Sequence, residues 1–376
     1  MRIGLVAGEA SGDLLGAGLL RAIRARVPDA IFEGVAGPEM VAAGCERWED
    51  AEALAVFGMI EPIAHFPRLL RLRRSLIRRW RERPPDAFVG IDAPDFNLGL
   101  EKALRQSGVK TVHYVSPTVW VWRAGRIKTV RRSADLVLCI FPFEKAIYDE
   151  HGVDAVFVGH PKADMLPAQV DVEAARRKLN LGEGRLVAIL PGSRTSEVDR
   201  LGPQFAAAAA IVARQCEDVR FVTAVASAKL RPAIEAQVAA TGIADRFTLV
   251  DGNSIDVLSA ANVVMLAAGT AALESALLGK PTISAYQVSK LSAAVIRLMG
   301  LRTRYYTMPN LMADELLVPE FIQEDMTPEA LADAALGLLN DPARREAISS
   351  RFAKLRAELA LGADERAADA VIKLAK

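Results

Sequence analysis

Short apolar segments alternate with helical stretches along this chain, and the alternation occurs twice. In the first half, runs rich in Val, Ile and Leu predict strands at 3–7, 31–36, 87–91, 111–115, 136–140 and 155–158. The second half repeats the pattern, with strands expected at 186–190, 220–224, 247–250, 263–266 and 282–285. Because apolar strands that alternate with helices are typical of parallel sheets covered on both faces, we expect an α/β protein with two doubly wound, Rossmann-like domains that face a cleft.

A turn-rich segment, GHPKADMLPAQVD (159–171), separates the two halves. We therefore predict one domain at 1–165 and a second at 166–349. The chain ends in an amphipathic stretch whose pattern predicts a helix at 363–374. We expect the C-terminal segment, about 350–376, to pack back on the first domain.

Composition narrows the class of protein. The 376 residues carry a net charge of +1, which gives no support to nucleic acid as the main partner. Cys45, Cys139 and Cys216 lie far apart with no CxxC pair, so we predict buried thiols, no metal site and no cofactor. The N-terminal apolar run is too short for a signal peptide, and no stretch is long enough to span a membrane. We expect a soluble, cytoplasmic protein.

Two loops of the second half end apolar strands and open helices, in AILPGSRTSEV (188–198) and VVMLAAGTAALESALLGKP (263–281). Neither reads GxxxxGK[ST] or GxGxxG, which disfavours a P-loop NTPase and an ordinary dinucleotide fold. Unpaired backbone N–H groups and the positive end of the helix dipole favour an anion there. A guanidinium can bind two phosphate oxygens, and a carboxylate one turn into a helix can accept ribose hydroxyls. We predict a site for a diphosphate with a ribose, formed by Gly192, Ser193, Arg194, Gly269, Thr270 and Glu274.

Two loops of the first half carry acidic residues at predicted strand ends. In VAGEASGDLLGAG (6–18), Glu9, Ser11 and Asp13 lie at the entry to a helix, where Ser11 or Asp13 acting as an N-cap is the structural alternative. In FVGIDAPDFNLGL (88–100), Asp92 ends a strand and Asp95 is expected to cap the next helix. A carboxylate at the end of a central strand suits a general base, and a salt-bridged structural Asp92 is the alternative.

A third segment of the first half, HYVSPTVWVWRAGRIKTVRR (113–132), combines Trp120 and Trp122 with basic residues. We expect a hydrophobic docking surface there, and RNA binding receives little weight. His113 is either an acid or base or, more in keeping with its place in a strand, a buried core residue.

Motifs along nearly the whole chain resemble those of the lipid-A-disaccharide synthases, inverting glycosyltransferases of the GT-B fold. They include LVAGEASGD, GVAGPEM, FGMIEP, GIDAPDFN, HYVSPTVWVWR, PFEKAIYD, VGHP, LPGSR, GTAALE, MPNL and ADERAADAVIKL. GIDAPDFN and HYVSPTVW are the most specific of these, whereas GTAALE recurs among related nucleotide-sugar enzymes.

The resemblance implies a donor, UDP-2,3-diacylglucosamine, and an acceptor, 2,3-diacylglucosamine 1-phosphate. It implies UDP and a β(1→6)-linked disaccharide 1-phosphate as products, formed without a metal ion. Asp92 then matches the base that deprotonates the acceptor 6-hydroxyl, and Arg194 and Glu274 match the UDP site. Glu9, Ser11 and Asn310 match residues associated with activity.

Acyl chains on both substrates imply that the enzyme acts at a membrane, so we expect a surface that binds anionic lipid. The segment FPRLLRLRRSLIRRWRERPP (66–85) combines an apolar stripe with many arginines. We predict membrane contact through Arg68, Arg71, Arg74, Arg78 and Trp80, with a helix packed on the sheet as the alternative. LSAAVIRLMGLRTRYY (291–306) is a second candidate. The enzyme would then be peripheral on the inner face of the cytoplasmic membrane.

Two other classes stay open on the residues alone. One is a different UDP-sugar enzyme of the same fold, either a 2-epimerase or a transferase to another lipid acceptor. The other is a membrane-associated protein that binds a nucleotide as a regulator, which would have no use for Asp92 at a strand end. The sequence also leaves the oligomeric state open, with a homodimer among the options.

Overall fold

The computed structural model describes residues 1–55, 62–118, 125–288 and 304–376, without the side chains of 55 and 62–66. The chain forms two compact units. Unit 1 comprises Met1–Asp164 and Glu358–Lys376, and unit 2 comprises Met165–Ala357. The sequence predicted the boundary between the two domains at 165/166, and it predicted that the chain packs back on the first domain from about residue 350.

Unit 1 contains a seven-stranded parallel sheet in the order β3-β2-β1-β4-β5-β6-β7. Its strands are β1 Arg2–Ala7, β2 Ile31–Ala36, β3 Cys45–Asp50, β4 Ala87–Ile91, β5 Lys110–Tyr114, β6 Leu136–Cys139 and β7 Ala155–Phe157. The central strands are apolar because both of their faces are covered, and every residue of β4 is buried.

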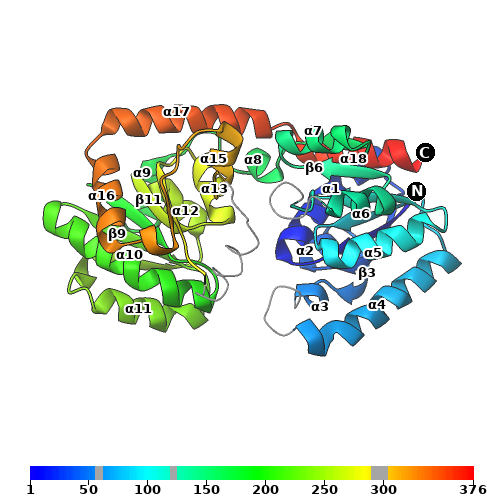
Figure 1. Ribbon diagram of the computed structural model, residues 1–376, viewed down its shortest axis with the longest axis horizontal. Coiled ribbons are helices and arrows are strands. Elements are labelled where there is room, and N and C mark those ends of the chain that lie inside the picture. The colour runs from blue at the N-terminus through cyan, green and yellow to red at the C-terminus, as the bar shows by residue number, and fades with distance from the viewer. Residues whose placement is uncertain (56–61, 119–124, 289–303) are drawn as a thin grey trace. The chain divides into compact units, whose positions relative to one another are not determined.

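Helices cover both faces of this sheet (Figure 1). One face carries α1 (Ala10–Arg26), α2 (Pro38–Ala42) and α18 (Ala363–Ala375), and the other carries α4 (Pro62–Glu82), α5 (Pro94–Arg105) and α6 (Arg126–Ser133). The remaining helices are α3 Glu52–Ala55, α7 Pro142–Glu150 and α8 Pro161–Met165. On the second face, α4 and α5 share one apolar core with the strands, which includes Trp80, Phe88 and Leu100.

The last helix of the chain belongs to unit 1. It packs against α1 so closely that a Cβ on Gly18 would lie 2.2 Å from an oxygen of Asp364. The Asp164 carboxylate accepts hydrogen bonds from the backbone N–H groups of Gly362 (3.0 Å) and Ala363 (2.7 Å), where α18 begins. The C-terminal residues therefore complete unit 1 rather than unit 2.

Unit 2 contains a six-stranded parallel sheet in the order β10-β9-β8-β11-β12-β13. Its strands are β8 Leu186–Leu190, β9 Arg220–Val225, β10 Phe247–Asp251, β11 Val263–Ala267, β12 Thr282–Tyr286 and β13 Glu320–Ile322. Its α-helices are α9 Val172–Lys178, α10 Thr195–Gln215, α11 Arg231–Ala239, α12 Ser254–Ala260, α13 Thr270–Leu277, α15 Met308–Ala313, α16 Pro328–Leu339 and α17 Pro342–Leu359. One core lies under α10 and α16 and a second under α9 and α12, one on each face of the sheet.

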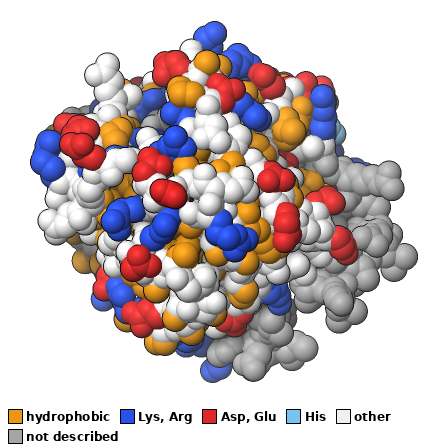
Figure 2. All heavy atoms as spheres, turned by 90° about the vertical axis from the view of Figure 1, so that its left-hand side faces the viewer, with side chains coloured by type: hydrophobic (Ala, Val, Ile, Leu, Met, Phe, Trp, Pro, Cys, Tyr) orange, Lys and Arg blue, Asp and Glu red, His pale blue; other side chains and the backbone are white. Residues whose placement is uncertain are grey.

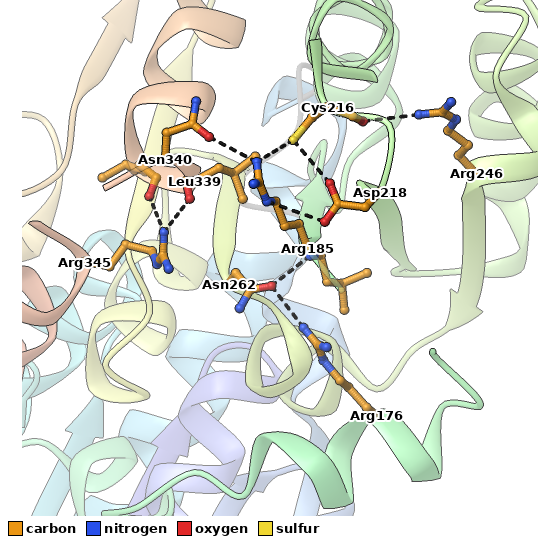
Figure 3. A network of polar contacts seen from close by, with 11 residues as sticks. Arg176, Arg185, Cys216, Asp218, Arg246, Asn262, Leu339, Asn340 and Arg345 are labelled. Carbon is orange, nitrogen blue, oxygen red and sulfur yellow. Dashed lines mark hydrogen bonds and ion pairs between the residues drawn. The ribbon is translucent and has the colours of Figure 1, made fainter. Parts of the chain in front are cut away.

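The edge at which the strands of unit 2 begin is filled by a network of its own side chains (Figure 3). Each of three arginines donates to carbonyl oxygens at the end of one helix: Arg246 at α10, Arg176 at α12 and Arg345 at α16. Positive side chains thus meet the negative ends of three helix dipoles. Because these helices run antiparallel to the strands, their N-termini point to the opposite edge of the sheet, where an anion can bind.

Figure 2 shows one face of the molecule, where blue basic and red acidic side chains are interspersed among the coloured residues. The coloured residues of that face form no extended basic patch.

Candidate active site

Each sheet reverses its strand order at one point. In unit 1 the reversal lies between β1 and β4, and in unit 2 it lies between β8 and β11. Ligands of doubly wound sheets bind beyond the carboxyl ends of the strands at this point. The loops found there carry Glu9 and Asp92 in unit 1, and Arg194 and Thr270 in unit 2. All four residues belong to the predicted site.

The two loops at the reversal in unit 1 meet around a small cavity of about 200 Å³. They are in direct contact, since a Cβ on Gly8 would lie 2.4 Å from the Cβ of Ala93. The cavity is lined by Gly8, Glu9, Leu54, Asp92, Ala93, Pro94, Asp95 and Phe96. Glu9 and Asp92 therefore share one cavity, whereas Ser11 is exposed in the first turn of α1 and does not line it.

Four non-glycine residues at the ends of three adjacent strands of unit 1 have positive φ angles. Glu9 follows β1 (φ 153°), Asp92 and Ala93 follow β4 (φ 51° and 42°), and Val115 follows β5 (φ 77°). A β-branched residue in this region is an outlier, and each such conformation costs about 1–3 kcal/mol. Strain of this kind persists where the surrounding structure fixes it, and it is concentrated here at the edge expected to bind a ligand.

The backbone of Asp92 is held on both sides. Its N–H donates to the carbonyl oxygen of Tyr114 in β5 at 2.8 Å, and its own carbonyl accepts from the side-chain Nδ2 of Asn97 in α5 at 2.8 Å. Asn97 is completely buried, and the bond that it donates to Asp92 is partly buried. The half-buried Asp92 side chain lines the cavity from a fixed backbone.

Two acidic residues have roles that differ from the predicted ones. Helix α1 begins at Ala10 rather than near Leu14, so Asp13 is not its N-cap. Asp13 is instead buried and accepts hydrogen bonds from the backbone N–H groups at the start of α2, those of Gly37, Glu39 and Met40. Asp95 does not cap α5 either, because Ala93 is the N-cap, and the Asp95 carboxylate pairs with Arg126.

The loops at the reversal in unit 2 line a larger pocket of about 510 Å³. Its lining includes all six residues predicted for the diphosphate and ribose: Gly192, Ser193, Arg194, Gly269, Thr270 and Glu274. Arg194 has a side chain that is 75% exposed, and Thr270 begins α13 with an exposed side chain. The pocket combines a guanidinium, a carboxylate and a helix N-terminus, which suits a phosphorylated ligand with hydroxyl groups.

Glu197 shapes this pocket and was not singled out in the sequence. Its Oε2 accepts from the N–H groups of Ser193 (2.9 Å) and Arg194 (3.3 Å), and its Oε1 lies 3.2 Å from Arg194 Nη1. A Cβ on Gly192 would lie 2.5 Å from Glu197, and φ is 127° at that glycine, so no other residue fits there without strain. A Glu three residues after a helix N-cap is the signal that could have found it.

A third loop of the pocket was also missed. Gly252, Asn253 and Ser254 follow β10 and line the same space, with φ of 50° at Asn253. The letters DGNS after an apolar run are a turn signal, but they do not reveal which other loops lie nearby.

Asn310 is completely buried in α15, and both ends of its amide are used. Its Oδ1 accepts from the N–H of Val318 at 2.8 Å, and its Nδ2 donates to the carbonyl of Val318 at 2.7 Å and to Glu320 at 2.9 Å. Glu320 also accepts from the N–H and hydroxyl of Thr307. Asn310 thus holds the 306–320 segment together from within, and its association with activity stays a prediction.

The predicted membrane contact of Trp80 is wrong. The Trp80 side chain is 0% exposed and packs on the sheet, with ring centroids 5.2 Å from Trp48 and 5.0 Å from Phe88. The arginine face of α4 is open, however, and Arg68, Arg71, Arg74 and Arg78 are all exposed. Among the residues that the structure describes, no helix is both long enough and apolar enough to cross a bilayer.

Other predicted features resolve as follows. His113 is a core residue, completely buried and bonded to Glu101. Trp120 and Trp122 lie outside the described residues, as does the segment 291–303 of the second membrane candidate.

Comparison with known proteins identifies the family. The family model described as lipid-A-disaccharide synthetase matches residues 3–373. The chain belongs to this lipid-A-disaccharide synthetase family. It is 48% identical to the lipid-A-disaccharide synthase of Alkalilimnicola ehrlichii, over 100% of this chain and 99% of the relative. It is 46% identical to that of Chromohalobacter salexigens, over 100% and 97%.

Solved structures share the fold with this member of the family. A UDP-GlcNAc 2-epimerase from Neisseria meningitidis, bound to UDP-GlcNAc, matches with a TM-score of 0.63 at 11% identity, over 100% of this chain and 99% of that one. MurG of Acinetobacter baumannii matches with 0.60 at 15% identity, and WaaG, a glycosyltransferase of lipopolysaccharide biosynthesis, with 0.58 at 14%, each over 99% of both chains. The predicted architecture, two parallel-sheet α/β domains of the GT-B type, is confirmed.

Proposed function

We propose that this chain transfers the sugar of UDP-2,3-diacylglucosamine to the 6-hydroxyl of 2,3-diacylglucosamine 1-phosphate. The products are UDP and the β(1→6)-linked disaccharide 1-phosphate of lipid A biosynthesis. Full-length membership in the lipid-A-disaccharide synthetase family carries this proposal. The loops at the two strand reversals support it, because they bear an acidic cavity in one unit and a phosphate-type pocket in the other.

In this proposal unit 2 binds the donor. Arg194 and the N–H groups at the start of α13 contact the diphosphate, and Glu274 accepts hydrogen bonds from the ribose hydroxyls. The bond from the anomeric carbon to the diphosphate oxygen breaks during transfer, and both electrons leave with UDP. Arg194 and the N–H groups then stabilise the negative charge of UDP, without a metal ion.

Unit 1 activates the acceptor. The oxygen of the 6-hydroxyl attacks the anomeric carbon from the side opposite to UDP, which inverts the configuration, and its proton passes to the Asp92 carboxylate. Asp92 suits this role because its backbone is fixed by β5 and α5 while its side chain lines a cavity. Glu9 lines the same cavity, and in this proposal it orients the acceptor sugar by hydrogen bonds.

An assay of UDP release tests the proposal. Purified protein is incubated with UDP-2,3-diacylglucosamine in detergent micelles, with and without 2,3-diacylglucosamine 1-phosphate. We expect UDP release that depends on the acceptor, with a disaccharide 1-phosphate detected by mass spectrometry. Equal release without the acceptor, or release without the disaccharide, would contradict the proposal.

We also propose that α4 binds an anionic membrane surface at which these lipid substrates are found. Arg71, Arg74, Arg78 and Arg81 recur at intervals of three and four residues, so they lie on one face of the helix, and all four are exposed. Three of them line a shallow hollow of about 480 Å³ between α4 and α5, which can hold lipid phosphates. The protein would then be peripheral on the cytoplasmic membrane.

A further inference from the structure

Two buried ionisable side chains of unit 1 form a pair that the proposed mechanism does not use. Glu101 of α5 and His113 of β5 are both completely buried, and Glu101 Oε1 lies 2.6 Å from His113 Nδ1. Their other polar atoms, Glu101 Oε2 and His113 Nε2, are buried with no partner among the described residues. A pair of this kind is costly to keep in an apolar core, so its presence calls for a reason.

The pair joins the same two elements that hold Asp92. Helix α5 supplies Asn97, whose Nδ2 donates to the Asp92 carbonyl at 2.8 Å. Strand β5 supplies Tyr114, whose carbonyl accepts from the Asp92 N–H at 2.8 Å. Glu101 lies one helical turn after Asn97, and His113 is the residue before Tyr114. The bond between Glu101 and His113 therefore ties together the two anchors of Asp92.

Gly90 of β4 leaves the space that this arrangement needs. A Cβ at that position would lie 2.2 Å from Glu101 Oε1 and 2.9 Å from the Cβ of Asn97. The Glu101 and Asn97 side chains thus share the space directly over the strand that ends in Asp92. The hydrogen bond between Glu101 and His113 can therefore prevent α5 and β5 from shifting against each other. Both elements lie next to the turn at Asp92 and Ala93, whose φ angles are positive.

We infer that Glu101 and His113 are positioning residues, which fix the direction of the Asp92 carboxylate by tying α5 to β5. This inference rests on the proposed role of Asp92 as the base. Since small displacements of a catalytic group lower the rate of the chemical step, loss of the tie acts on kcat rather than on donor binding in unit 2.

The link between α5 and β5 requires a hydrogen bond between the side chains at positions 101 and 113, and it does not require that they be charged. Burial raises the pKa of the Glu101 carboxyl, against the opposing effect of His113. A raised pKa favours the uncharged carboxyl, which still forms a hydrogen bond with His113 Nδ1. A glutamine at position 101 retains both the size of the side chain and a hydrogen bond to His113 Nδ1, whereas a methionine retains the size alone.

The test compares Glu101→Gln with Glu101→Met in the full-length protein. Turnover is measured with both acylated substrates, and UDP affinity is measured by calorimetry. We expect Glu101→Met to lower kcat by about 10- to 100-fold and Glu101→Gln to stay within about threefold of the wild type, both with unchanged UDP affinity. Wild-type kcat in Glu101→Met, or an equally large loss in Glu101→Gln, overturns the inference. If Glu101→Met does not fold, two variants of His113 replace the pair. His113→Asn retains a polar group in place of Nδ1 and should keep a kcat near that of the wild type, whereas His113→Val should lower kcat as expected for Glu101→Met.

Adding Glu101→Met to an Asp92→Asn variant distinguishes failure of this inference from failure of the proposed function. In Asp92→Asn, the residual rate should not fall further when Glu101→Met is added, because the group that the tie positions is already lost. A full additional loss in the double variant would show that the pair acts elsewhere. Near-normal turnover in Asp92→Asn alone would instead overturn the role of Asp92 itself.

Discussion

The Arg194 guanidinium and the Glu197 carboxylate lie 3.2 Å apart at the mouth of the unit 2 pocket. The same carboxylate accepts hydrogen bonds from two backbone N–H groups of the loop, so it fixes the loop and pairs with its cation at once. If a phosphate binds in the pocket, the Arg194 guanidinium can pair with it instead of with Glu197, while the Glu197 carboxylate still accepts hydrogen bonds from the loop backbone.

Arg194→Ala should therefore weaken UDP binding by about 10- to 100-fold, the usual effect of losing a hydrogen bond to a charged group. Calorimetric titration with UDP measures it. Arg200→Ala is the matched control, since Arg200 is exposed on α10 and does not line the pocket. Unchanged affinity in Arg194→Ala would remove this residue from the donor site.

Asp92→Asn should lower turnover by about 10²- to 10⁴-fold, because an amide cannot accept the proton of the acceptor hydroxyl. UDP affinity should be retained, since the proposed donor site lies in unit 2. Asp95→Asn makes the same change of charge in the same cavity and should have a much smaller effect on kcat. Steady-state rates of the two variants decide the matter, and equal losses in both would argue against a specific base.

Reversing the charges of Arg74 and Arg78 together should weaken binding to anionic vesicles by more than 10-fold at low salt, since each basic residue at such a surface contributes about 1 kcal/mol. Sedimentation with phosphatidylglycerol vesicles measures this, and added salt should weaken the wild type in the same direction. Arg214→Glu, an exposed position on α10, is the control. Wild-type binding in the double variant would exclude this face of α4.

Trp80→Ala should destabilise the protein by about 3–5 kcal/mol, because it removes a large buried ring from the core under α4. Vesicle binding by the folded fraction should not change. Denaturant unfolding and vesicle sedimentation of the same sample test both parts. A normal unfolding midpoint with weakened vesicle binding would restore the original prediction of membrane contact.

Asp364 should make stability fall as the pH rises. Burial, Glu365 and Asp164 raise the pKa of its carboxyl from 3.8 to about 6, opposed by Arg21. The folded state thus holds a proton between about pH 4 and 6 that the unfolded chain has lost, so this contribution is present below pH 4 and disappears as the pH rises through 6. Asp364→Asn should be more stable than the wild type at pH 7 and should lose that advantage at pH 4. Thermal melts of both proteins across this range provide the measurement, and a constant difference between them would contradict it.

Strands buried on both faces could be predicted from the sequence almost residue by residue, as in Leu186–Leu190 and Ala87–Ile91. Their apolar side chains face helices on both sides, so the signal is local. Strands β3 (CERWED) and β13 (EFI) were missed because both lie at an edge of a sheet and carry charged residues. Neither contains the apolar run that marks a central strand.

Some residues of the candidate site could likewise be predicted from local sequence, and others could not. Loop residues such as Arg194 and Asp92 could be found because small and polar residues follow apolar runs. The roles of Asp13 and Trp80 could not be predicted, since Gly37 and Trp48, which contact them, lie more than 20 residues away in the chain. Trp80 was assigned to the wrong face of α4 because the helix carries apolar and basic residues in nearly every turn, and only the packed structure shows which face meets the sheet.

The placement of α18 has a practical consequence for dissecting this enzyme. Unit 2 is a single uninterrupted stretch, Met165–Ala357, whereas unit 1 needs both ends of the polypeptide. A fragment stopped near residue 165 would expose the groove on α1 that α18 fills, and it should aggregate unless the terminal helix is fused back through a short linker. Separate expression should therefore begin with unit 2, and affinity tags are safer at the amino end.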